Sequence, residues 1–344
     1  MPIPYAGQLA ALGTACCWVG SSLAFESATR RSGSLTVNIL RLAIASLLLI
    51  PVSALVRGRP FPIDASARTW AILSLSGLVG FTFGDFCLFR SYLFLGPRRA
   101  NAMMALAPPF TALIGWLLLG ERLSGRALLG MVLTVAGVAW AVLEGHRPAG
   151  ADPRSKPGID PRIDPRIDPG TDPGADPGEA LQPSSLPGRP TGHSGGHSTG
   201  HPILGVALGA GGALGQGGGL VLSKLGMGSY DPFAATQIRV LAGALGYVVI
   251  LSTLGWWPRV RGAFGDRRSL AAIATGSFFG PFLGVSLSLI AVQHTLTGIA
   301  ASFMALTPVL IIPPVVLFRG ERVGVGGVAG AVIAVIGVVL LFLP

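Results

Sequence analysis

Long apolar stretches alternate with short polar segments along most of the chain. A helix needs about 20 mostly apolar residues to cross the hydrocarbon core of a bilayer, and ten stretches reach that length. They lack the polar stripe of an amphipathic helix in a soluble protein. The pattern predicts an all-α membrane protein with ten transmembrane helices, at 5–25, 35–56, 70–95, 100–119, 126–144, 203–223, 233–254, 270–292, 300–318 and 325–343.

Composition and charge exclude the soluble classes. Hydrophobic residues make up 51% of the chain and charged residues 12%, too few charges to cover a soluble fold. The formal net charge is +10, but the basic residues stand in small groups between apolar stretches, as in loops beside a membrane. We therefore expect no nucleic-acid partner. Cys16, Cys17 and Cys87 lie inside apolar stretches without metal-ligand spacing, which predicts neither disulfides nor a thiolate metal site.

The two halves of the chain are copies of each other. Shifting residues 80–143 by 200 positions aligns them with 280–343 without a gap, and 17 of these 64 positions are identical. A repeat of five helices makes the second copy enter the membrane from the opposite face, and inverted repeats are typical of transporters. We expect the first five-helix repeat at 5–145 and the second at 203–344.

A polar segment at 146–202 separates the two repeats. Asp-Pro recurs every four residues from Asp160 to Asp176, and proline at this density removes amide donors and prevents a helix. The segment is predicted to be a disordered linker. Calcium binding by its aspartates, or metal binding by His193, His197 and His201, is a lesser alternative, because no regular element would hold either set in place.

The sequence around a Gly-Glu-Arg motif in each half resembles the end of an EamA domain. The matching residues are Leu106-Ala107-Pro108-Pro109 through Gly120-Glu121-Arg122-Leu123, Gly130 and Ala136-Gly137-Val138, then Leu306-Thr307-Pro308 through Gly320-Glu321-Arg322, Gly330 and Gly337-Val338. Two such domains in tandem are similar to the drug/metabolite transporter superfamily. The resemblance implies ten helices, export or exchange of small organic solutes, a cavity between the repeats and cytoplasmic termini. The long linker departs from the short connection usual in the family.

The distribution of basic residues favours the opposite orientation. With a cytoplasmic N-terminus, the inner short loops would hold six basic residues and the outer ones ten.

Polar and aromatic side chains inside the expected helices are the candidate substrate-binding residues. An ionisable group in lipid is costly and usually faces a cavity or a partner. The candidates are Trp18, Asn38, Arg41, Asp85, Arg90, Tyr92, Gln237, Arg239, Gln293 and His294. Arg90 follows Asp85 by five residues, which turns it about 140° away on a helix, so we expect Asp85 to face Arg41 instead. Trp18 and Tyr92 could stack on a flat or apolar solute.

The second repeat differs from the first in this region. It has Val285 and Ile290 where the first repeat has Asp85 and Arg90, so the expected cavity is chemically lopsided. Asp85 or His294 could couple transport to protons, because either can change its charge when its surroundings alternate. Simpler alternatives are an ion pair that only fixes helix packing, and arginine, histidine or aromatic side chains that anchor helix ends at the interface.

Prolines and glutamates recur at equivalent places in the two repeats. Pro108 and Pro308 precede Gly-Glu-Arg by twelve residues, and we expect each to break and kink its helix beside a transport site. Glu121 and Glu321 lie between helices, where they can offset the positive end of the next helix or bind a loop arginine, as gate or loop-shaping residues. Close packing of the fifth and tenth helices is expected at Gly130, Gly137, Gly330 and Gly337.

These observations favour a transporter over an enzyme. The chain has no HExxH, Walker or GxSxG motif, so we expect no catalytic site, no cofactor and no metal. We expect a secondary transporter of small organic metabolites in the inner (plasma) membrane, with the solute and the lipid bilayer as its partners and a monomer as one option. The alternatives are a membrane scaffold or sensor that acts through the linker, and a lipid-carrier flippase.

Overall fold

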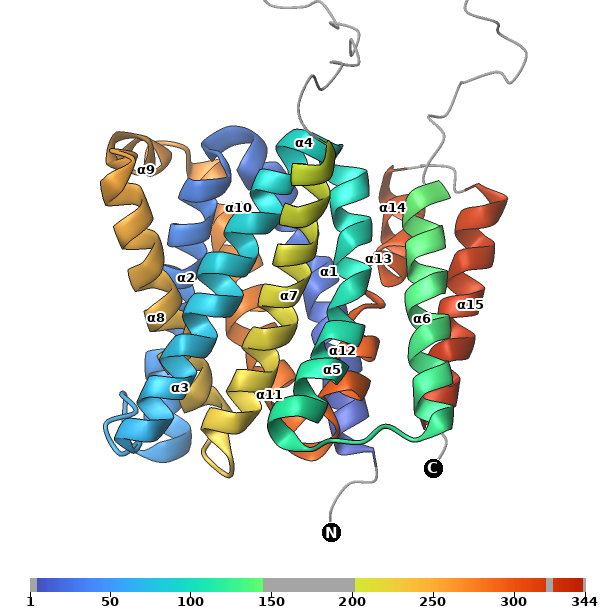
Figure 1. Ribbon diagram of the computed structural model, residues 1–344. Helices are drawn as coiled ribbons and strands as arrows, with labels where there is room; N and C mark the ends of the chain where they lie inside the picture. The colour runs from blue at the N-terminus through green and yellow to red at the C-terminus, as the bar shows by residue number, and fades with distance from the viewer. Residues whose placement is uncertain (1–4, 145–201, 320–323, 343–344) are drawn as a thin grey trace, which may run out of the picture. The chain divides into compact units, whose positions relative to one another are not determined.

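The computed structural model describes residues 5–144, 202–319 and 324–342, which form helices joined by short turns (Figure 1). Residues of both repeats belong to one compact unit. The expected linker lies outside the described residues except for Pro202, which begins a helix. Among the described residues there is no strand.

The first repeat contains α1 (Ala6–Ser32), α2 (Ser34–Arg57), α3 (Ala67–Gly77), η1 (Leu78–Gly84), α4 (Asp85–Met103), η2 (Met104–Leu106), α5 (Ala107–Leu119) and α6 (Gly125–Glu144). The second contains α7 (Pro202–Met227), α8 (Pro232–Thr253), α9 (Trp257–Ala263), α10 (Arg267–Ser277), η3 (Phe278–Gly284), α11 (Val285–His294), α12 (Thr297–Met304), α13 (Thr307–Leu310), α14 (Ile312–Arg319) and α15 (Val325–Phe342). Within the described ranges, nine stretches are long and apolar enough to span a bilayer, and Met104–Leu119 is a shorter tenth. The predicted all-α, ten-helix architecture is confirmed, and the chain is a multi-pass membrane protein.

A π-helical segment interrupts the third membrane-spanning stretch of each repeat at the same place. The segments are η1 and η3, and they end at Gly84 and Gly284. Each wide turn places one extra residue in the helix just before Asp85 or Val285. Sequence analysis did not foresee these segments, which are frequent at functional sites in helices.

The first helix of each repeat packs on the π-helical segment of the other repeat. α7 lies along α3, η1 and α4, and α1 lies along α10, η3 and α11. A Cβ atom added to Gly215 of α7 would lie 2.6 Å from the Gly84 Cα, and one added to Gly280 would lie 2.5 Å from the Ser21 Oγ of α1. Small residues therefore let the backbones approach closely where the two repeats meet.

Close packing of the fifth and tenth helices is confirmed, between α6 and α15. A Cβ atom added to Gly330 would lie 2.5 Å from the Ala141 nitrogen, and one added to Gly337 would lie 2.5 Å from the Thr134 nitrogen. The glycines fit because each faces the backbone of the opposite helix.

The expected helix boundaries need correction near the prolines. We expected the third helix to end before Gly96-Pro97, but α4 continues to Met103. Phe94 and Met103 lie against Gly205 and Gly209 of α7, so tertiary packing outweighs the local signal.

The expected helix breaks at Pro108 and Pro308 are present, and each break comes directly before the proline. These prolines occupy the first turns of α5 and α13, where the missing N–H costs nothing because first-turn amides have no intrahelical partner. The expected helix at 300–318 is accordingly divided into α12, α13 and α14.

Candidate functional site

A buried carboxylate lies between the two repeats and receives donors from both. Arg41 of α2 donates through Nη2 to Oδ2 of Asp85, as the sequence predicted, and the two residues are 7% and 6% exposed. Gln216 of α7 donates through Nε2 to Oδ1 of Asp85 at 2.9 Å and to the Gly80 carbonyl at 3.4 Å. The second repeat therefore supplies part of the hydrogen bonding of a charge that belongs to the first.

Gln216 was missed by the sequence analysis, although a signal was present. It is a polar residue set among glycines in the middle of an apolar helix. The glycines before and after Gln216 let α7 approach η1 closely. This close approach brings the side-chain amide of Gln216 to Asp85.

Several buried polar atoms near this level of the fold have no hydrogen-bond partner among the described residues. They are both amide atoms of Asn38, Nε of Arg41 and the hydroxyl of Tyr247. Asn38 precedes Arg41 by three residues, so the two side chains leave α2 on the same face. Unpaired buried groups are costly, so this region offers hydrogen bonds that a bound solute could complete.

Arg239 is the counterpart of Arg41 in the second repeat. Each is the eighth residue of its helix, Arg41 in α2 and Arg239 in α8. The end of α2 contacts the start of α8, because Arg57 bonds Tyr230 at 3.0 Å, so the two helices run in opposite directions. Arg239 is 5% exposed, and its guanidinium carbon lies 5.1 Å from the centre of the Phe81 ring.

A polar cluster that we call the Glu121 clasp joins the repeats at the N-terminal end of α1; its members are Glu121, Lys224, Thr295 and Thr297. Lys224 of α7 donates to Oε1 of Glu121 and to the Thr295 carbonyl, both at 2.7 Å. The other oxygen, Oε2, accepts from the Thr297 amide at 2.8 Å and from the Thr297 hydroxyl at 2.6 Å. Thr295 packs on Gly7 in the first turn of α1.

This arrangement corrects the expected role of Glu121. We expected the carboxylate to offset the start of the next helix or to bind a loop arginine. It instead caps α12 of the other repeat and pairs with Lys224 of α7. Glu321, its counterpart, lies outside the described residues.

A second polar cluster at the same end also joins the two repeats. Arg57 donates to Asp64 at 2.5 Å and to the Tyr230 hydroxyl at 3.0 Å, and that hydroxyl donates to Asp64 at 3.0 Å. The hydrogen bond from Arg57 lowers the pKa of Asp64, whereas burial, followed by the bond to Asp64, raises the pKa of Tyr230.

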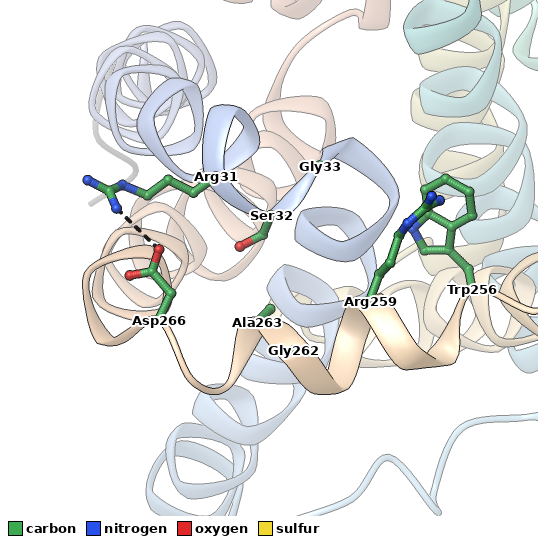
Figure 2. Close-up of a pocket in the computed structure, with 8 residues that line it drawn as sticks. All are labelled: Arg31, Ser32, Gly33, Trp256, Arg259, Gly262, Ala263 and Asp266. Carbon is green, nitrogen blue, oxygen red and sulfur yellow. Dashed lines mark hydrogen bonds and ion pairs between the residues drawn. The ribbon is translucent and has the colours of Figure 1, made fainter. Parts of the chain in front are cut away.

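The opposite end of α1 contacts the second repeat through a different set of polar groups, which includes a hydrogen bond of 2.6 Å between the Ser32 and Ser269 hydroxyls. Arg31 donates to Asp266 at 3.2 Å, and the two side chains are partly exposed, at 45% and 34%. They border an open groove, drawn in Figure 2, in which the Arg259 guanidinium lies 3.7 Å from the centre of the Trp256 ring. Asp266 also caps α10, and the hydrogen bond from the Ser269 amide, more than the one from Arg31, lowers its pKa.

Three polar candidates lie away from Asp85 and have other partners. Gln237 donates to the Pro60 carbonyl at 3.0 Å and accepts from Ser53. Gln293 donates to the Gly228 and Tyr230 carbonyls in the turn before α8. His294 is exposed, and its Nδ1 lies 2.9 Å from the Ile290 carbonyl of its own helix.

Two further candidates have other described neighbours, and a third is not described. Arg90 is exposed and lies over the Phe86 ring, 5.8 Å from its centre. Trp18 is half-buried and packs against the apolar cluster that contains Phe81 and Val285. The side chain of Tyr92 lies outside the described part of the structure.

Comparisons with known proteins agree with the fold and the repeat. The EamA-like transporter family matches residues 5–143 and again 203–343. An uncharacterized transporter of Archaeoglobus fulgidus is 25% identical over 136 residues, which cover 38% of this chain and 46% of that relative. The match therefore spans about half of the relative's length.

A solved crystal structure, described only as that of a protein, has the same fold with a TM-score of 0.67 and 16% identity, over 98% of this chain and 96% of that one. The family match covers both halves of the chain, each with the five-helix arrangement described above. The chain belongs to the EamA-like transporter family.

Proposed function

We propose that the protein carries small organic solutes across the membrane by alternating access between its two repeats, as an exporter or exchanger driven by a solute or ion gradient. The observation that carries this proposal is the Asp85 carboxylate, buried where the repeats meet and bonded by Arg41 of one and Gln216 of the other. A relative movement of the repeats changes the partners of this group, which links solute binding to the movement.

The Glu121 clasp supports a state that is closed at the N-terminal end of α1. Lys224 and Glu121 are 25% and 10% exposed at the side chain. Glu121 of the first repeat forms three short hydrogen bonds to the second, one from Lys224 and two from Thr297. At the other end, the described polar contacts between the repeats include the partly exposed Arg31–Asp266 pair, which water screens, and the Ser32–Ser269 hydrogen bond. Opening of the Glu121 clasp together with closure of the opposite end would expose the Asp85 region to the other side.

The proposal is tested by flux measurements in vesicles. Purified protein is reconstituted, the vesicles are loaded with a mixture of metabolites, and the solutes that leave are identified by mass spectrometry. Asp85→Asn is expected to reduce flux strongly while the protein still folds, because asparagine keeps the shape but removes the charge that Arg41 neutralises. Arg261→Gln, an exposed position on α9, is the matched control and should leave flux unchanged.

The same assay separates transport from the alternatives. Deletion of residues 150–200 should leave flux intact, whereas a scaffold or sensor that acts through this segment would lose its output. Unchanged flux in Asp85→Asn would remove Asp85 from the site. If no solute leaves vesicles that hold folded protein, the transport of soluble metabolites is wrong, and a labelled lipid carrier is the next substrate to test.

A further inference from the structure

The guanidinium of Arg239 is buried without an anionic partner. Its Nε and Nη1 have no hydrogen-bond acceptor among the described residues, and none of the described carboxylates forms an ion pair with it. Guanidinium is always protonated in proteins, so burial does not remove the charge. An unpaired ion in a water-poor interior costs free energy. A bound ligand of the opposite charge would remove this cost.

The first repeat shows which group is missing. Arg41, the equivalent residue, is neutralised by Asp85 at the start of α4. The repeat alignment puts Val285 at the equivalent position at the start of α11, and this side chain is buried in an apolar cluster. The second repeat thus has the arginine without the carboxylate.

The surroundings of Arg239 suggest the shape of the missing group. Its Nη2 lies beside Gly80, where an added Cβ atom would stand 3.5 Å away, and the Phe81 ring covers the guanidinium. Gln216 donates to the Gly80 carbonyl, so the site adjoins the hydrogen bonds around Asp85. A single guanidinium matches one planar carboxylate through two parallel hydrogen bonds, and a phosphate dianion would be only half neutralised.

We propose that Arg239 binds the carboxylate of the transported solute. This carboxylate takes the place in the second repeat that the Asp85 carboxylate holds in the first. The substrates are then small organic monocarboxylates with an apolar body. This inference rests on the proposed transport function and adds the substrate class. Because Arg239 is only 5% exposed, an anion reaches it when the repeats separate, so binding and opening are linked.

The test compares a charged probe with its uncharged isostere. Benzoate, benzamide and inorganic phosphate are each titrated into the purified full-length protein in nanodiscs, and the thermal unfolding midpoint and the equilibrium affinity are measured. Benzoate is expected to raise the midpoint saturably, and benzamide and phosphate are not. Arg239→Gln should weaken benzoate binding by at least about 30-fold, because it removes the charged partner of the carboxylate. Arg261→Gln should bind as the unmodified protein does.

A conservative variant keeps the test decisive if Arg239→Gln does not fold. Arg239→Lys retains the charge but loses the planar pair of donors, so benzoate should bind more weakly than to the unmodified protein and still better than benzamide. No saturable effect of benzoate on the unmodified protein, unchanged binding in the Arg239 variants, or stabilisation by phosphate alone would each overturn the proposal.

The anion-site proposal and the transport proposal can fail independently of each other. If Arg239-dependent benzoate binding is found but vesicles show no flux, transport fails and the anion site stands. If Asp85→Asn reduces flux but benzoate does not bind, the anion site fails and transport stands.

Discussion

Arg41 and Arg239 occupy the same position in two copies of one five-helix unit and differ in their ion-pair partners. Both lie over an aromatic ring. Arg41 also donates to Asp85, whereas Arg239 has two nitrogen atoms without acceptors and no carboxylate partner among the described residues. The helices that carry them are alike in length, although α8 is the more buried of the two. The two repeats therefore share the helix arrangement but not the carboxylate that neutralises the arginine. A bound anion would gain most at Arg239, in the second repeat.

The ends of α1 show a similar contrast. Ser21 of α1 packs on Gly280, and Gly219 of α7 packs on Gly80, so Ser21 and Gly219 are equivalent positions in the two repeats. The residue five positions later is Glu26 in α1 and Lys224 in α7. Lys224 joins the Glu121 clasp, whereas Glu26 pairs with Arg30 of its own helix. Charges of opposite sign at equivalent positions prevent the same lysine–glutamate contact from forming at both ends.

The largest expected effect comes from removing one arginine at a time. Arg41→Met leaves Asp85 buried with a single donor, so the free energy of unfolding should fall by about 3–5 kcal/mol. Arg239→Met removes a charge that has no described partner, so it should cost much less or stabilise the protein. Chemical unfolding of both variants in lipid–detergent micelles measures the difference.

The double variant Arg41→Met/Asp85→Val makes the first repeat resemble the second at this site. It removes both buried charges, so most of the loss seen in Arg41→Met should be recovered. Equal losses for Arg41→Met and Arg239→Met would contradict the contrast between the two sites.

An intermediate effect is expected at the Glu121 clasp. Glu121→Gln keeps the shape but weakens the charge-assisted bonds to Lys224 and Thr297, with a loss of about 1–3 kcal/mol at this end. Hydrogen exchange of the Thr297 amide, which donates to Glu121, should become faster. Arg31→Gln at the exposed end is the comparison and should change stability by less than about 1 kcal/mol. Unchanged exchange at Thr297 would show that the clasp does not hold this end closed.

The smallest effect concerns the caps of α3 and α10, which are Ser66 and Asp266 at equivalent positions. The pKa of Asp266 is lowered in the folded protein, so its contribution is present above the ordinary value of 3.8 and is lost as the pH falls through the lowered value. Ser66 does not titrate. Asp266→Ser should therefore remove part of the decline in thermal stability below about pH 4, in a pH series of unfolding midpoints, and an unchanged profile would count against this assignment.

The helices and the repeat followed from sequence because they depend on local composition. Apolar stretches of bilayer length can satisfy their backbone groups in lipid only as helices, and a charged motif that recurs at a fixed offset marks a duplication. The pairing of Asp85 with Arg41 was also predictable, since a buried carboxylate needs a cation and Arg90 points away on the helix.

The remaining site residues could not be placed from sequence because their partners are distant in the chain. Gln293 and His294 are as polar as Gln216, yet the turn before α8 and their own helix satisfy them, and only Gln216 reaches Asp85. Glu121 and Thr297 are 176 residues apart, and nothing in their local sequences indicates that one caps the helix of the other.

Ten membrane-spanning helices in two related halves can be predicted from the amino-acid sequence, because hydrophobic length and internal similarity are properties of the chain alone. Which polar groups meet depends on the packing of the helices, because glycine contacts bring α7 to η1 and α1 to η3 and so set the neighbours of each buried charge. This packing gives Arg41 a carboxylate and leaves Arg239 without one among the described residues, a difference that depends on which helices face each other across the two repeats.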